Sequence, residues 1–410
     1  MSYIFALTST PALGYGCAAG IAACLTALGA LRWRLLLTAA QAARKASETD
    51  DAVSTGPLPR VSIIVPVRND KTGLEANLPR LLTQRYEGTY EVIVADEGSD
   101  DESLLVVERL QQTYSHLRAT AVPPTSRNIT PRKLAVTLGV RAARSEWVIV
   151  LSPDSMPPSD DWLNRMARHF TDDADYVSTY VSTDGECTSA VHRTAYERTM
   201  RQALRYAYWL GGCITGSEPT GVAYRKSWFL DASGYADSLC LPFGEDAILT
   251  SLHAAPERSV LLLDAEVKLT EQLPSTRVNA SQRVERQETQ RHLSPSARRH
   301  LARQRWATSF SQLSILLIIV YTALRTTGDL TQGTYAMQML PYDAIIGLLT
   351  ALGLAIALIL LRRLTDALSE PHMGLSLIAQ ALLAPWRHLR VSLQRYAHRD
   401  DFVRDWGRGL

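Results

Sequence analysis

Acidic residues follow short apolar runs of this sequence, in positions that suit ion binding or proton transfer. Asp96 stands directly after one such run and opens the segment Asp96–Asp101. Asp154 lies after another run, and the pair Glu245-Asp246 follows Gly244. Carboxylates can hold hard cations such as Mg²⁺, and they can take a proton from a reacting group. A cation beside such acids can bind a diphosphate, and Lys133 is the candidate for this cation.

Each of these acids also has a simpler explanation. Asp96–Asp101 suits a solvated turn, because Gly and Asp favour turns. Glu245-Asp246 suits the first turn of a helix expected over Ala247–His253. The phosphate-loop pattern GxxxxGK[ST] is absent from the sequence, which excludes a P-loop NTPase, and the absence of GxGxxG after the first apolar run weakens a dinucleotide oxidoreductase.

Short β-branched runs alternate with helical patterns in this part of the chain. The alternation predicts an α/β fold whose mostly parallel sheet has helices on both faces. Ligands bind such sheets beyond the carboxyl ends of the strands, where Asn69, Asp96 and Asp154 fall. The expected strands are Val61–Pro66, Tyr90–Ala95 and Glu146–Leu151, and the expected helices are Leu74–Leu82, Ser103–Tyr114, Lys133–Ala143 and Ser189–Trp209.

The composition excludes several classes of protein. The 43 Lys and Arg nearly balance the 41 Asp and Glu, so the net charge of +2 argues against a nucleic-acid partner. Apolar residues make up 46% of the chain and charged residues 20%, which argues against disorder. The five cysteines lack the spacing of a zinc site and are expected to be free thiols.

Three long runs carry no charge: Pro11–Leu31, Ala307–Leu324 and Ala344–Leu361. Each has about the length that a membrane-spanning helix needs. The basic residues that flank these runs place the middle of the chain in the cytosol and the N-terminus outside. The alternatives are buried core helices and, for the first run, a cleavable signal peptide, which would lack its usual basic start.

The order of these pieces resembles a family 2 glycosyltransferase with the GT-A fold. The resemblance covers roughly Val61 to His300 and rests on shared order, since each motif alone is weak. Its motifs are VSIIVPVRND, YEVIVADEGSDDES, RKLAVTLGVRAARSEWVIVLSPDSMPPSDDWL, GVAYRKSWF and FGEDAILT. Two apolar runs after such a domain also resemble the membrane-bound members of that family.

The resemblance implies roles for single residues. The nucleotide-sugar pocket would be lined by Pro66, Val67, Asn69, Asp96, Lys133, Ser152 and Pro153. Asp96 looks like the acid that contacts the base of the nucleotide, and Lys133 looks like a contact of the diphosphate or of the region near the base. Asp154 matches the last acid of the DxD motif, which holds Mg²⁺ or Mn²⁺. Asp246, next to Glu245, matches the general base of the family's ED motif.

Two departures from the family pattern bear on the activity. The DxD motif reads Ser152-Pro153-Asp154, so its first acid is a serine that can still hydrogen-bond a hydroxyl. The QxxRW motif of processive synthases is represented by Arg291-His292, which remain candidates for clamping the diphosphate. In this register Glu288 replaces the glutamine. A competing register uses Arg305-Trp306, and a simpler explanation of the whole basic segment is a helix that meets lipid headgroups.

The resemblance therefore implies an inverting, metal-dependent glycosyltransferase of the cytoplasmic membrane. The donor would be a nucleotide-sugar, expected to be UDP-linked, and the acceptor a lipid-linked or growing glycan. Alternatives are a processive polysaccharide synthase and an inactive nucleotide-binding scaffold. Thr215–Gly221 is expected to be a flexible loop near the acceptor. The expected organisation is an anchor (1–46), a cytosolic catalytic domain (59–290), a basic interfacial segment (291–306), two spans (307–361) and an amphipathic region on the membrane surface (362–410).

Overall fold

The computed structural model describes residues 56–123, 130–184, 188–239, 241–272, 276–307 and 358–368, with isolated positions elsewhere. Strands and helices alternate through the first half of this region, as the sequence predicts. In chain order they are β1 (Val61–Val67), α3 (Lys71–Leu82), β2 (Tyr90–Asp96), α4 (Ser103–Gln111), β3 (Leu117–Ala121), α5 (Pro131–Ala142) and β4 (Trp147–Val150).

The second half of the domain is less regular. Its elements are β5 (Ser155–Met156), α6 (Trp162–Ala167), β6 (Tyr176–Thr179), β7 (Val181–Asp184), α7 (Ser189–Leu210), β8 (Val222–Arg225), α8 (Lys226–Asp231), η2 (Ala236–Ser238), α9 (Glu245–His253), η3 (Pro256–Arg258), β9 (Ser259–Leu262), β10 (Leu269–Gln272) and α10 (Thr276–Thr289).

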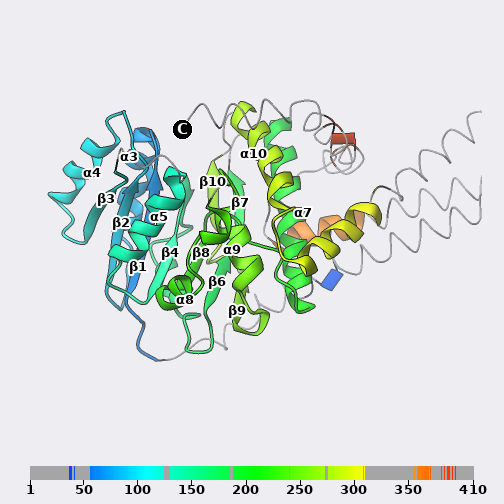
Figure 1. Ribbon diagram of the computed structural model, residues 1–410, viewed down its shortest axis with the longest axis horizontal. Coiled ribbons are helices and arrows are strands. Elements are labelled where there is room, and N and C mark those ends of the chain that lie inside the picture. Colours follow the sequence, from blue (N-terminus) through cyan, green and yellow to red (C-terminus); the bar gives the residue numbers. More distant parts are fainter. Residues whose placement is uncertain are drawn as a thin grey trace, which may run out of the picture.

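Two sheets organise the domain (Figure 1). The larger has the order β3-β2-β1-β4-β8-β6-β9, in which β8 runs antiparallel to both β4 and β6 and the other neighbours are parallel. The smaller has the order β5-β10-β7. The expectation of a mostly parallel sheet is therefore confirmed, with one antiparallel strand, β8, between β4 and β6.

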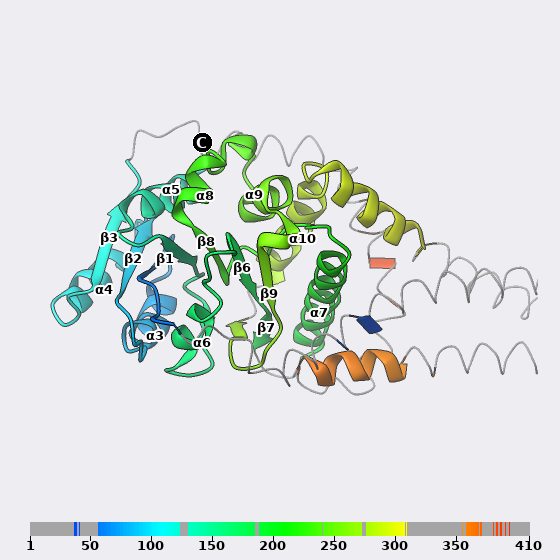
Figure 2. The same cartoon turned by 90° about the horizontal axis from the view of Figure 1, so that it is seen from below.

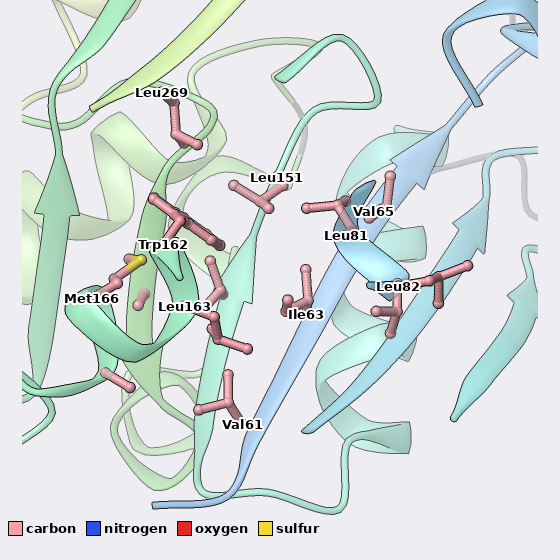
Figure 3. Packing of buried hydrophobic residues seen from close by; sticks show 14 of the residues in the cluster. Val61, Ile63, Val65, Leu81, Leu82, Leu151, Trp162, Leu163, Met166 and Leu269 are labelled. Carbon is pink, nitrogen blue, oxygen red and sulfur yellow. The ribbon is translucent and has the colours of Figure 1, made fainter. Parts of the chain in front are cut away.

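The alternation of side chains along β1 gives the larger sheet a core on each face. Val61, Ile63 and Val65 join the core that contains α3 and α6, whereas Ile64 joins the core that contains α5 and α9. Figure 2 shows α3 and α6 on one side of the sheet and α5, α8 and α9 on the other. Trp162 fills the centre of the first core with no exposed surface, and its indole N–H donates to the carbonyl of Val267 at 3.1 Å (Figure 3).

Helix α7 is the scaffold of the second half of the domain. Its buried side packs against Leu293 and Ala297, which follow α10, and against Leu361, Leu364 and Leu368. Residues 358–367 are helical and lie beside α7 in Figure 2. Part of the region expected on the membrane surface therefore packs on the catalytic domain, because its leucines recur on one side of a helix.

Within the described residues, no helix is long and apolar enough to cross a membrane. The predicted spans Pro11–Leu31, Ala307–Leu324 and Ala344–Leu361 lie almost entirely outside those residues. Cys213 is a free, buried thiol, as expected, and the other four cysteines also lie outside the described residues.

Because Trp162 is fully buried, we expect Trp162→Ala to destabilise the domain by about 3–5 kcal/mol. Leu105→Ala is the control, since Leu105 is 60% exposed and its truncation is expected to cost about 0.5 kcal/mol or less. Urea unfolding followed by tryptophan fluorescence and circular dichroism measures both. Equal midpoints for the two variants would contradict this account of the core.

Candidate active site

The loops that follow β1 and β2 are bonded to each other at the carboxyl ends of the strands. The backbone N–H of Glu97 donates to the carbonyl of Val67 at 2.8 Å. Asn69, whose φ of 50° is left-handed, accepts from the backbone N–H of Asp100 at 2.8 Å through its side chain. The backbone N–H of Asn69 in turn donates to Ser99 Oγ at 3.0 Å. These bonds fix the predicted rim of the nucleotide pocket.

Asp96 holds its own loop in place. Its side chain is buried and accepts from the backbone N–H groups of Gly98 and Ser99 at 3.1 Å. These bonds form the turn that is expected for Asp96–Asp101 from its Gly and Asp residues. Pro66 and Val67 are buried in β1, where they pair with Ala95 and Asp96. The contact of Asp96 with a nucleotide base stays a prediction.

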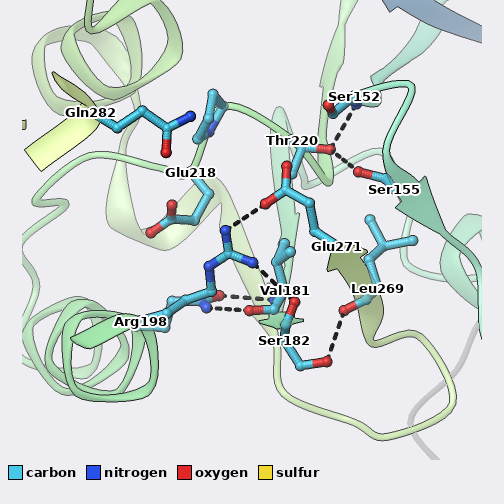
Figure 4. Close-up of polar contacts among 12 residues, drawn as sticks. Ser152, Ser155, Val181, Ser182, Arg198, Glu218, Thr220, Leu269, Glu271 and Gln282 are labelled. Atoms are coloured by element: carbon cyan, nitrogen blue, oxygen red, sulfur yellow. Dashed lines mark hydrogen bonds and ion pairs between the residues drawn. The ribbon is translucent and has the colours of Figure 1, made fainter. Parts of the chain in front are cut away.

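The loop that contains Asp154 is held from two sides. The backbone N–H of Ser152 donates to Thr220 Oγ1 at 2.9 Å, and Ser155 Oγ lies 2.7 Å from the same oxygen (Figure 4). From α3, the side-chain amide of Asn77 donates to the carbonyl of Pro153 at 2.8 Å. Thr220, which precedes β8, and Asn77 of α3 thus hold the loop in place. They do so although Ser152 stands where the family motif has an acid.

Asp154 is only partly exposed, and its charge is disfavoured. Burial, together with the nearby carboxylates of Asp70 and Glu271, raises its pKa to about 6. A divalent cation beside Asp154 would compensate this negative charge. Oxygen ligands of this kind suit Mg²⁺ or Mn²⁺.

Protein ligands alone do not complete a metal site in the described part of the chain. No group of three or more His, Cys, Asp or Glu side chains there is placed to hold a metal ion. Mg²⁺ commonly takes one or two carboxylates together with phosphate oxygens of a substrate. The donor set at Asp154 therefore fits a metal that is bound jointly with a diphosphate.

Lys133 does not occupy the predicted role of a diphosphate contact. Its side chain has no exposed surface, and its ammonium donates to the carbonyls of Ser238 and Leu241 and to that of Phe243 at 3.4 Å. An ammonium has three N–H donors, which matches these three acceptors. Lys133 therefore anchors the segment that leads into Gly244, because a buried charge is stable only when its donors are satisfied.

Asp246 lies in the first turn of α9 with 3% of its surface exposed. Tyr235 Oη donates to its Oδ1 at 2.7 Å. The pKa of Asp246 is raised to about 6, with burial as the main cause and Glu245 acting in the same direction. The Tyr235 hydrogen bond and the charges of Arg132 and Lys133 oppose this rise. The result is an oriented carboxylate that is ionised at pH 7 and basic enough to accept a proton.

Arg132 is a member of the site that the sequence analysis did not select. Its guanidinium lies 3.8 Å from Glu97 Oε1, and its other charge partners are Glu245 and Asp246. Burial opposes the charge of Arg132, but these carboxylates raise its pKa. Its only signal in the sequence was its position before Lys133. The first residues of α5 face Glu245 and Asp246, called the ED segment below, only once α5 packs on the sheet.

Gly244 directly precedes the ED segment and lies against the end of α10. Its φ of 75° is left-handed, and an added Cβ would lie 2.6 Å from Thr289 Cγ2. Both features require glycine at this position. Arg291 and His292 come just after α10 and are exposed, and Arg291 pairs with Glu288 at 3.3 Å. This end of α10 is near the ED segment in space, because Thr289 lies against Gly244. The contact of Arg291 and His292 with a diphosphate stays a prediction.

The competing register places its residues differently. Arg305 donates to the side-chain oxygen of Gln290 at 2.9 Å, and Trp306 is 65% exposed. Both registers thus meet at the end of α10, since Gln290 is adjacent to Arg291. The geometry leaves both open.

The loop Thr215–Gly221 is buried and is held by ion pairs, contrary to the expectation of a flexible loop. Glu218 accepts from Arg201 at 2.7 and 3.3 Å and from Arg205 at 2.7 Å. Burial would raise its pKa, but these two guanidinium groups hold the pKa of Glu218 well below its usual range. The sequence of the loop gave no sign of these partners, because both lie on α7.

Comparisons with known proteins bear on the fold and on the class of enzyme. The model of the family described as Glycosyl transferase family 2 matches residues 62–231, from β1 to the end of α8. Asp246 and α10 lie beyond that match. The chain is also similar to a solved mannosyltransferase, PcManGT from Pyrobaculum calidifontis in complex with GDP-Man and Mn²⁺, at 20% identity and a TM-score of 0.53, over 81% of this chain and 97% of the other.

Two further solved structures are more distant. TarS 1-349 of S. aureus in complex with UDP-GlcNAc has 15% identity and a TM-score of 0.40, with 70% of this chain and 79% of the other covered. The glucosyl-3-phosphoglycerate synthase of Mycobacterium tuberculosis has 14% identity and a TM-score of 0.37, with 55% and 76% covered. The family match over residues 62–231 identifies the protein as a glycosyltransferase.

We expect Lys133→Met to destabilise the domain by about 3 kcal/mol or more, because three buried carbonyls lose their donor. Lys71→Met is the control, since its ion pair with Glu102 is exposed and its loss is expected to leave the urea midpoint almost unchanged. Urea midpoints and proteolysis within residues 236–243 measure the effect. If both variants behave alike, Lys133 is not an anchor.

Proposed function

We propose that the protein transfers a sugar from a nucleotide-sugar to an acceptor hydroxyl, with inversion at C1. Asp246 is the observation that carries the proposal. It is buried, oriented by Tyr235, and its pKa of about 6 suits a general base at neutral pH. An inactive scaffold has no use for such a carboxylate, whose burial costs free energy.

In the proposed reaction Asp246 removes the proton of the acceptor hydroxyl as its oxygen bonds to C1. The bond between C1 and the diphosphate oxygen breaks on the opposite face, and the electron pair leaves with the nucleoside diphosphate. A divalent metal bound at Asp154 would stabilise the charge of that leaving group. Arg132 lies beside Glu97, Glu245 and Asp246, and its charge opposes the effect of burial, which raises the pKa of Glu97 and of Asp246.

We keep UDP-sugars as the first donors to test, on the strength of the sequence motifs. GDP-mannose is the second, because the Pyrobaculum calidifontis enzyme was solved in complex with GDP-Man and Mn²⁺. The loops that line the pocket are bonded to each other in this chain, and their side chains set the choice of sugar. Donor identity therefore has to come from a panel of nucleotide-sugars.

We further propose that the protein is anchored in the cytoplasmic membrane, with its catalytic domain in the cytosol and its N-terminus outside. The three uncharged runs and their basic flanks support this. Trp306 and Trp386 are more than half exposed, and each is adjacent in sequence to an arginine. Tryptophan beside basic residues is typical of a membrane interface. Such an anchor suits an acceptor that is lipid-linked or held close to the bilayer.

The proposed activity is tested with the full chain in membranes, by release of the nucleoside diphosphate from a panel of donors with Mg²⁺ or Mn²⁺. We expect Asp246→Asn to lower kcat by about 10²–10⁴-fold, the usual contribution of a general base. Asp231→Asn is the control, because Asp231 is exposed at the end of α8. Equal turnover before and after the change at Asp246 would exclude it as the base.

The rate is expected to fall as the pH drops through about 6, where Asp246 takes up a proton. The Tyr235 hydrogen bond stabilises the ionised form, so Tyr235→Phe should raise the pKa and move the acidic limb upward by about one pH unit. Profiles of kcat against pH measure the shift, with Tyr114→Phe as the control. An unchanged limb would show that another group sets it.

Asp154→Asn should raise the Mn²⁺ concentration needed for half-maximal rate by about tenfold or more, because the site loses its carboxylate ligand. Asp173→Asn, at an exposed position, should leave it unchanged. Metal titrations of the rate at fixed donor concentration compare the two. The metal assignment fails if Asp154→Asn leaves the titration curve in place.

A further inference from the structure

Two buried tyrosines belong to the same core as the helix that carries Asp246. Tyr224 lies on β8 and has no exposed surface, and Tyr235 directly precedes η2 and is 3% exposed. Both join the core that contains α5 and α9. Strand β8 and helices α8 and α9 lie side by side in Figure 1 and Figure 2. Aromatic side chains thus support the proposed base from the interior of the domain.

Phe229 of α8 holds both tyrosine rings in place. Its ring is stacked on Tyr224, with the centroids 5.1 Å apart and an angle of 12° between the planes. It meets the ring of Tyr235 edge-on, with the centroids 5.3 Å apart. Tyr235 Oη in turn donates to Asp246 Oδ1 at 2.7 Å. The three rings therefore form a continuous packed group that ends at the carboxylate.

The hydroxyl of Tyr224 has no evident purpose in packing. Its Oη is buried away from water and has no hydrogen-bond partner at normal distance and angle in the described structure. A buried hydroxyl without a partner costs free energy, and phenylalanine would fill the same space without that cost. A role for this hydroxyl therefore has to come from a neighbouring polar group.

The polar groups that act on Tyr224 are Tyr235 and Asp246. Burial and the charge of Asp246 hold the pKa of both tyrosines well above the usual value, so both hydroxyls keep their protons at neutral pH. The two hydroxyls also act on each other, since Tyr235 lowers the pKa of Tyr224 and Tyr224 raises that of Tyr235. Tyr235 gives its proton to Asp246, but its oxygen can still accept a hydrogen bond.

We propose that Tyr224 is a second positioning residue for Asp246, whose hydroxyl donates to Tyr235 Oη while Tyr235 donates to the carboxylate. The inference rests on the proposed function, in which Asp246 is the base. Hydrogen bonds in a chain strengthen one another by about 10–30% per bond. Such bonds are often long without substrate and shorten in the reacting complex. Tyr224 thus strengthens the bond that stabilises the ionised form of Asp246.

Other titratable groups also face Asp246, and the substitutions below leave them in place. They are Arg132 and Lys133 of α5, Glu245 of α9, and Tyr176 of β6, whose own pKa is raised in part by the charge of Asp246. A change in the pKa of Asp246 after Tyr224→Phe therefore reports on Tyr224.

The first test is the dependence of kcat on pH for the full chain in membranes. Tyr224→Phe should move the acidic limb upward by about 0.3 pH units, less than Tyr235→Phe, because Tyr224 acts through Tyr235. In the Tyr235→Phe background the same change should shift the limb no further, since the chain of bonds is already broken. An unmoved limb in the wild-type background, or shifts that add in the double variant, would overturn the proposal.

The second test does not depend on turnover, so its failure is distinguishable from a failure of the proposed function. It compares urea midpoints of the detergent-solubilised full chain at about pH 5 and about pH 7.5. A carboxyl whose pKa is raised by folding loses its stabilising effect as the pH rises through its folded pKa, which is about 6 for Asp246. A further rise in that pKa enlarges the loss.

Tyr224→Phe should therefore lower the midpoint more at the higher pH than at the lower. If the hydroxyl has no partner, its removal should instead raise the midpoint equally at both pH values, which would contradict the proposal.

Tyr208→Phe is the matched control. Tyr208 is also buried, belongs to a different core, and loses a hydrogen bond to the carbonyl of His300 at 3.3 Å. This change should lower the midpoint by the same amount at both pH values and leave the acidic limb in place, because its acceptor does not titrate. If Tyr208→Phe moves the limb as Tyr224→Phe does, the shift reflects a general loss of stability and the assignment of Tyr224 is wrong.

Discussion

The arrangement of the reaction centre depends on one buried charge. Lys133 reaches from α5 across to the segment before α9 and satisfies three of its carbonyls, at Ser238, Leu241 and Phe243. That segment carries Tyr235 at its start and Gly244 at its end, so the proposed base and the residue that orients it are positioned by the same ammonium. Because α5 also packs on β1, the anchor ties the ED segment to the strand edge at which the nucleotide pocket is predicted.

Opposite charges meet at the candidate site. The guanidinium of Arg132 lies 3.8 Å from Glu97, and its charge lowers the pKa of Glu97 and of Asp246, whereas burial raises the pKa of both carboxyls. One cation at the start of α5 thus acts on two acids that come from different loops of the fold.

The regular half of the fold and helices α7 and α9 could be predicted from the sequence, whereas the short strands of the second half could not. Val61–Val67 and Tyr90–Asp96 are largely apolar because both faces of these strands are covered. Strands β6, β7, β9 and β10 have four residues each, too few to show a period. The position of Asp246 at a helix start was readable, but the role of Lys133 was not, because its acceptors are backbone carbonyls more than one hundred residues away. Glu218 was missed for a similar reason, since its partners are on another element.

The contact between Gly244 and Thr289 has a consequence for how such sequences can diverge. The two residues are distant in the chain, yet a methyl group added at one would collide with the side chain of the other. The left-handed backbone at Gly244 removes any relief through rotation. A bulkier residue at position 289 would have to push α10 away from the ED segment and carry the neighbouring arginine with it. Among related sequences these two positions should therefore be inherited as a unit, and the side chain at 289 should stay small wherever the base is retained.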